Sequence, residues 1–235
     1  MLPRVPIRLA PPLAGALRSI CATALPQSKP PPEPLSPSDL EAISALLPRL
    51  LSAGHVPAAG RLLSAALLLP GLLPGSQDRL PLDSLAAHLA SLPTLSAAFA
   101  LLTALRHHPA RPSPLLLASP LLGSLLSLRR ARDASSVLRW LCRPDSPRRP
   151  DAATYADAVA GLCRLEDPRA ALAALREMAT DGLQATRELR EAVRDAMLQD
   201  ARIEEAWALE AAMRQPEETG KLVELIDKLL SAWEP

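Results

Sequence analysis

The sequence contains few residues of the types that most often act in catalysis, and their spacing does not predict an active site. The chain has four histidines, of which His107 and His108 are adjacent. On a helix their side chains point about 100° apart, so they cannot share a metal ion as an i, i+4 pair can. Because Pro109 follows them, we expect both at the end of a helix, where histidine is favourable beside the terminal carbonyls.

Other catalytic patterns are also missing from the sequence. Cys21, Cys142 and Cys163 form no CxxC pair, which favours ordinary buried thiols in a reducing compartment. No GxxxxGK, HExxH or GxSxG segment occurs. The acidic pairs Glu204–Glu205 and Glu217–Glu218 fit exposed helix faces or helix starts better than an acid/base dyad. We expect no enzyme, no cofactor and no metal site.

Arginines offer the clearest binding chemistry. Residues 25–150 carry 13 basic and 7 acidic groups, whereas residues 151–235 carry 10 and 18. Clustered arginines bind phosphate groups, so one edge of an RNA-binding groove is one interpretation of the basic cluster. A solvated loop and helix face is an equally ordinary one. The cluster consists of Arg129, Arg130, Arg132, Arg139, Arg143, Arg148 and Arg149.

The composition predicts an all-α protein. Its apolar residues are almost all Ala and Leu, with one Tyr, one Phe and three Trp, and Ala and Leu favour helices over strands. The 26 prolines crowd the first 150 residues and fall largely between helical runs. No apolar run reaches the roughly 18 residues that span a bilayer, so no membrane insertion is expected.

The N-terminus resembles an import signal. Residues 1–25 contain Arg4, Arg8 and Arg18 and no acidic residue, which predicts an organelle transit peptide, mitochondrial or alternatively chloroplast. A disordered basic tail is the plainer alternative. Residues 26–38 are rich in proline and predict an extended spacer before the first helix.

Two helical hairpins in residues 151–213 repeat with a period of 35 residues. Shifting the sequence by 35 superposes Ala171 on Ala206 and Leu172 on Trp207. A fixed period of this size indicates stacked helical repeats, in which neighbours cover each other's apolar face. A small residue near the start of each second helix marks five units with spacings of 39, 36, 37 and 35. These residues are Ala59, Ala98, Ala134, Ala171 and Ala206.

The repeat register predicts about five helix-turn-helix units over residues 39–213, with a C-terminal capping helix in 214–235. Ser38 and Asp39 are expected to cap a first helix over 40–51. Pro-rich insertions at 70–75 and 143–150 are expected in loops between hairpins. The three tryptophans fall at apolar positions of the helical pattern and are expected between helices: Trp140, Trp207 and Trp233.

The best repeat resembles a pentatricopeptide repeat, the helical unit of short plant organelle proteins. The resemblance is specific over residues 151–213, suggestive over 115–150 and weak over 40–114. It is carried by the segments Arg149-Pro150-Asp151, Thr154-Tyr155, Val159, Gly161-Leu162-Cys163-Arg164, Ala171-Leu172, Glu177-Met178, Gly182-Leu183 and Arg202-Ile203-Glu204-Glu205-Ala206.

This resemblance implies a right-handed α-solenoid that binds single-stranded organelle RNA, with one base read by two positions of each repeat. It also implies that Tyr155 lies in the core, because the family places a packing aromatic inside the hairpin at that position. Of the five pairs, only the two Ser–Asp pairs look like base readers, and Ala156 has no side-chain hydrogen bond to offer. The pairs are Ser44 with Asp78, Asp83 with Pro114, Ser119 with Asp151, Ala156 with Thr186, and Glu191 with Lys221.

The leading hypothesis is an RNA-binding repeat protein that assists splicing or processing of organelle transcripts alongside protein partners. Its candidate RNA contacts are Ser119, Asp151, Arg129, Arg130, Arg132, Ser44 and Asp78. The alternative is a helical-repeat scaffold that does not bind RNA and serves a mitochondrial complex, such as a ribosome or a respiratory assembly.

Overall fold

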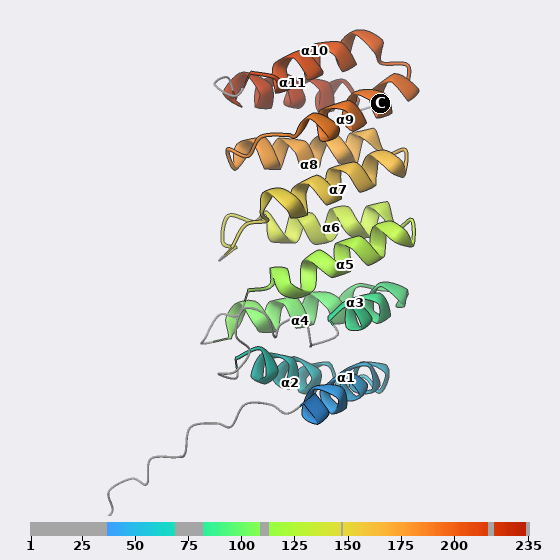
Figure 1. Ribbon diagram of the computed structural model, residues 1–235, viewed down its shortest axis with the longest axis vertical. Helices are drawn as coiled ribbons and strands as arrows, with labels where there is room; N and C mark the ends of the chain where they lie inside the picture. The colour runs from blue at the N-terminus through green and yellow to red at the C-terminus, as the bar shows by residue number, and fades with distance from the viewer. Residues whose placement is uncertain (1–36, 69–81, 109–112, 147, 216–218, 234–235) are drawn as a thin grey trace, which may run out of the picture. The chain divides into compact units, whose positions relative to one another are not determined.

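The described part of the chain is entirely helical, as the composition predicts. A computed structural model describes residues 37–68, 82–108, 113–146, 148–215 and 219–233. No strand occurs in these ranges (Figure 1). The helices are α1 (Pro37–Ser52), α2 (Val56–Leu68), α3 (Leu82–Ser91), α4 (Ser96–His107), α5 (Leu115–Ser127), α6 (Ala131–Leu141), α7 (Ala152–Arg164), α8 (Pro168–Thr180), α9 (Arg187–Gln199), α10 (Ile203–Met213) and α11 (Thr219–Ala232).

Each helix packs against near neighbours in the chain, which is consistent with a helical repeat. Within pairs, α1 contacts α2, α5 contacts α6, α7 contacts α8, and α9 contacts α10. Between pairs, the first helices α1, α3, α5, α7 and α9 each contact the next in the series. Among the second helices, α2 contacts α4 and α6 contacts α8. Apolar stripes are therefore covered by adjacent pairs.

The turn inside the helix pairs has one recurrent geometry. A residue with left-handed backbone geometry lies five positions before the marker alanine in four pairs: Gly54 (φ 77°), Arg129 (φ 57°), Glu166 (φ 57°) and Ala201 (φ 59°). At Glu166, its own N–H donates to the Cys163 carbonyl, and the next N–H donates to the Leu162 carbonyl. The other three turns repeat this pattern, which is the Schellman arrangement of a helix end.

The second pair is the exception, because Pro93 occupies the corresponding position. The proline ring fixes φ near −65°, so this residue cannot adopt the left-handed conformation. The chain between α3 and α4 turns instead through residues 92–95. All five marker alanines are nonetheless buried, including Ala98 in this pair. Burial of the marker alanine thus follows the predicted register in every pair.

Several predicted boundaries are confirmed and one is wrong. α4 ends at His107, residues 143–146 and 148–150 are not helical, and α11 begins at Thr219. The first helix, however, begins at Pro37 rather than after a cap at Ser38 or Asp39. Proline suits the first turn because its missing N–H is not needed there.

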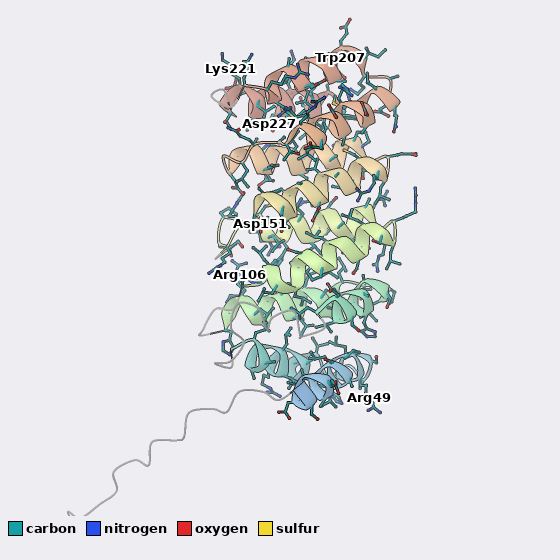
Figure 2. The ribbon with its side chains drawn as sticks, viewed as in Figure 1. Arg49, Arg106, Asp151, Trp207, Lys221 and Asp227 are labelled. Carbon is teal, nitrogen blue, oxygen red and sulfur yellow. The ribbon has the colours of Figure 1, made fainter. Side chains whose placement is uncertain are left out.

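The expectation that all three tryptophans are buried is wrong for Trp207. Trp140 is buried and Trp233 is half-buried, but Trp207 is 53% exposed on α10 (Figure 2). Its equivalent one repeat earlier, Leu172, is fully buried. α8 is covered by α11, whereas the last pair has no following pair in the described chain.

The final helix folds back along the array. α11 packs mainly against α8, with a smaller contact to α10. Ile226 and Leu229 are its buried residues, and Arg176 of α8 pairs with Asp227 on α11 at 2.5 Å. α11 therefore packs beside α8, at the position where a stacked repeat would place the second helix of the next pair.

Some predictions concern residues outside the described ranges. These are the transit peptide, residues 26–36 of the Pro-rich spacer, the insertion at 70–75 and the candidate residue Asp78. Pro37 and Ser38 of the predicted spacer belong to α1, so the spacer prediction is wrong there. Among the helices that are described, none combines the length and apolar character needed to cross a bilayer.

Candidate nucleic-acid interface

Ser119 and Asp151 are brought together through Thr154. Thr154 Oγ1 lies 3.0 Å from Ser119 Oγ, a hydroxyl–hydroxyl hydrogen bond that joins α5 to α7. The Thr154 N–H donates to Asp151 Oδ1 at 2.8 Å, which makes Asp151 the N-cap of α7. The three side chains form one continuous polar row across two consecutive helix pairs.

Asp151 is exposed and charged. Hydrogen bonds from the side chain and then the backbone N–H of Thr154 lower the pKa of Asp151. An ionised carboxylate accepts hydrogen bonds only, and such groups recognise the amino donors on base edges. Asp151 is labelled in Figure 2 at the start of α7. Ser119 is half-buried, so of the two it is the less accessible.

Thr154 was not among the predicted site residues, and the repeat register does not point to it. It lies 35 residues after Ser119. The spacing between these two pairs is 37, so the register equivalent of Ser119 is Ala156, and Thr154 lies two positions before it.

The other predicted base-reading positions are less suited to that role. Ser44 is half-buried on α1, and its expected partner Asp78 is not described. Glu191 pairs with Arg187 on its own helix at 2.9 Å. Thr186 caps α9 by accepting from the Leu189 N–H. At the Ser119 row, by contrast, both residues of a predicted pair are joined through Thr154.

Arg130 is engaged inside the fold. Its Nη1 donates to the Ala90 and Leu92 carbonyls at 2.6 and 2.5 Å, and its Nε donates to Asp133 at 2.6 Å. Carbonyls of a last helical turn have no partner within the helix, so Arg130 closes the end of α3. A phosphate would have to compete with these contacts.

Arg149 is also engaged internally, in a polar network between helix pairs. It donates to Asp181 and Glu177 of the α8 region and to the Cys142 carbonyl. The Tyr155 hydroxyl donates to Asp181 at 2.6 Å and lies 3.1 Å from Cys142 Sγ. Tyr155 is fully buried, which confirms its predicted place in the core.

Burial controls the ionisation of this network and of the nearby thiol. Loss of solvation raises the pKa of Tyr155 and of Cys142, and the hydrogen bond to Asp181 raises that of Tyr155 further. Burial likewise raises the pKa of Cys163 to about 12. Thiols that stay protonated are poor nucleophiles, so neither cysteine is activated at neutral pH.

The remaining arginines of the cluster are exposed and fall into two groups. Arg129 and Arg148 lie on turns, where their guanidinium groups make no ion pair with any described residue. Arg132, Arg139 and Arg143 line a groove of about 930 Å³ between α6 and α8, beside the end of α11. No hydrogen bond or ion pair within the described ranges joins Arg132 to the Ser119–Asp151 row.

Two further arginines line this groove that the basic cluster in the sequence does not include. Arg169 and Arg176 of α8 complete its lining. They follow Arg132 and Arg139 by 37 residues, the distance from Ala134 to Ala171, so the repeat register was the signal that could have found them. Stacking of α6 on α8 sets the two helices' arginines side by side.

No group of three or more His, Cys, Asp or Glu residues suited to a metal ion occurs in the part of the chain that the structure describes. Comparison with protein-family models gives no match, and comparison with curated proteins gives none either. Any assignment of function therefore depends on the geometry above.

Proposed function

We propose that the chain is an organelle RNA-binding protein built as a right-handed α-solenoid of the pentatricopeptide type, and that it assists splicing or processing of transcripts. The observation that carries this proposal is the polar row of Ser119, Thr154 and Asp151. It joins the two residues that the family register assigns to one base, and it ends in an exposed, ionised carboxylate.

Single-stranded RNA suits such a row because its unpaired bases present their hydrogen-bonding edges. Asp151 would accept from a base amino or imino group, and the Ser119 hydroxyl can donate or accept. The family uses a Ser–Asp pair of this kind for a purine. Arg129 and Arg148, with exposed guanidinium groups, are available for phosphate contacts.

Crosslinking and sequencing of RNA bound in isolated organelles tests the proposal. We expect enrichment of one or a few transcripts over a control protein, with a purine at the protected site. Binding should weaken as salt rises, since phosphate contacts displace counterions. Equal recovery of RNA with the control protein would overturn the proposal.

Asp151→Asn sharpens this test, because asparagine caps a helix about as well as aspartate. The variant should remain folded but change which base is enriched, since an amide donates as well as accepts. Asp157→Asn, on the exposed face of the same helix, is the matched control and should leave the base preference unchanged. The same preference in all three proteins would show that Asp151 is only a cap.

A scaffold subunit of a mitochondrial ribosomal or respiratory complex is the second candidate. It is favoured by the internal use of Arg130 and Arg149, which removes two of the seven clustered arginines from phosphate binding. A scaffold would be recovered with a protein complex from organelle extracts treated with ribonuclease, and without crosslinked RNA.

Location in an organelle is proposed from the N-terminal sequence alone, with three arginines and no acidic residue in positions 1–25. A fusion of residues 1–30 to a fluorescent reporter should reach mitochondria. Chloroplast signal would favour the alternative organelle, and cytosolic signal would refute the import prediction.

A further inference from the structure

The groove between α6 and α8 carries unpartnered positive charge over an apolar base. Arg132, Arg139 and Arg143 line it, and their guanidinium groups make no hydrogen bond or ion pair with any described residue. Leu138, Ala170 and Ala174 contribute apolar surface between them. A surface of this composition suits a ligand with both apolar and anionic side chains.

At one end of the groove, a helix of the chain itself makes the kind of contact that such a ligand would make. Arg176 on α8 is equivalent in register to Arg139 on α6, since each lies five residues after its marker alanine. Arg176 is held by Asp227 of α11, whose Ile226 and Leu229 are buried in the same packing. An amphipathic helix that carries a carboxylate already satisfies this arginine position on α8.

We propose that the groove binds an acidic amphipathic helix of a partner protein, which lies along α6 as α11 lies along α8. A carboxylate of that helix pairs with Arg139, as Asp227 pairs with Arg176, and Arg132 and Arg143 take further carboxylates. Helix-in-groove recognition of this kind depends on a few apolar anchors, and the charges set orientation and partner choice.

The lining favours a peptide over RNA. No aromatic side chain lines the groove, and single-stranded RNA sites typically combine basic tracks with aromatic stacking platforms. Asp167 and Glu177 add negative charge to the lining, which opposes a phosphate chain. The alanines of α8 instead permit close approach of another helix. The inference does not depend on RNA binding at the Ser119–Asp151 row.

The chain supplies its own probe, the α11 sequence of residues 219–233. A labelled peptide of this sequence, added to the full-length protein, should bind, and Arg139→Glu should weaken binding at least tenfold. Arg139→Gln should weaken it less, because it removes the positive charge without adding a negative one. Arg164→Glu, an exposed arginine on α7, is the matched control and should bind like the wild type.

Charge reversal completes the test. A peptide carrying Asp227→Arg should bind the wild type poorly and recover affinity for the Arg139→Glu protein. Equal peptide binding by the wild type and Arg139→Glu overturns the proposal, since the peptide would then be exchanging with α11 on α8. Loss of oligouridine or oligoadenine binding in Arg139→Glu, with the peptide unaffected, would assign the groove to RNA. Loss of self-association in that variant would assign it to a second copy of this chain.

Discussion

At the residue scale, the buried polar network around Tyr155 connects two helix pairs. Its hydroxyl reaches Asp181 beyond the end of α8, and Arg149 from the preceding loop binds the same carboxylate. Hydrogen bonds to charged groups contribute more than neutral ones. The network therefore fixes the position of the 143–150 loop against the fourth pair.

Tyr155→Phe removes one donor from Asp181 without changing the shape of the core. We expect a loss of about 1.5 to 3 kcal/mol in the free energy of unfolding, because the bond is to an ionised partner. Urea denaturation followed by circular dichroism measures the change. Thr180→Val is the control, since that hydroxyl is exposed and bonds only a carbonyl of its own helix. Equal effects of the two variants would show that the Asp181 bond contributes no special stability.

The burial of a single residue could be predicted from the sequence only where the repeat register determines which residues surround it. Tyr155 was placed correctly in the core because the family that residues 151–213 resemble has a packing aromatic at that position. The internal roles of Arg130 and Arg149 were not predictable, since their carbonyl partners are 40 and 7 residues away and carry no sequence signature. The sequence of an arginine cluster does not distinguish side chains that bind phosphate from side chains that bind backbone carbonyls.

At the element scale, α5 and α7 approach so closely that Gly161 has no space for a side chain. A Cβ there would lie 2.5 Å from Leu126 Cδ1 and 3.1 Å from Leu126 Cγ. The Leu126 side chain is itself buried, so it can yield only by disturbing its neighbours. The glycine of the Gly-Leu-Cys-Arg segment is therefore a packing requirement of the contact between α5 and α7, the first helices of two successive pairs.

Gly161→Ala should destabilise the chain by about 1 to 3 kcal/mol through overpacking, reduced by the better helix propensity of alanine. Gly123→Ala on α5 is the matched control, since no atom lies within 4 Å of its Cβ. That variant should stabilise by about 0.5 to 1 kcal/mol. Thermal melts of both proteins measure the difference, and two shifts of the same sign would contradict the packing explanation.

Helix boundaries were predictable where local chemistry determines them. His107 with Pro109 marked the end of α4, and the Ala and Leu content gave the helical class. The path of α11 was not predictable, because its apolar stripe is compatible with either α8 or α10 as neighbour. In the structure α11 packs mainly against α8, where Asp227 pairs with Arg176, 51 residues earlier.

At the scale of the whole molecule, burial depends on whether another pair follows. Leu172 and Trp207 hold the same place in the 35-residue repeat, yet the first is fully buried and the second half-exposed. The periodic sequence gives identical expectations for both positions. The sequence also predicts a capping helix in 214–235, but α11 packs mainly against α8, and Trp207 on α10 stays exposed.

Leu172→Ala should cost about 2 to 5 kcal/mol, the range for a large-to-small change in a packed core. Trp207→Ala should cost no more than about 1 kcal/mol, because its main described partner is Arg194, 5.3 Å from the ring centroid. Chemical denaturation of the two variants tests this contrast. A cost for Trp207→Ala as large as that for Leu172→Ala would mean that another molecule covers α10 in solution.

The turn shared by four of the five pairs sets where this chain can change length. From the left-handed residue to the marker alanine the distance is always five residues in those pairs, while the distance between successive alanines varies from 35 to 39. One residue gained or lost inside that segment would rotate the second helix by about 100° and turn its apolar stripe outward. Insertions between pairs leave every stripe in place. Evolutionary lengthening of such a repeat is therefore confined to the junctions between pairs, and a deletion scan should find the same positions tolerant.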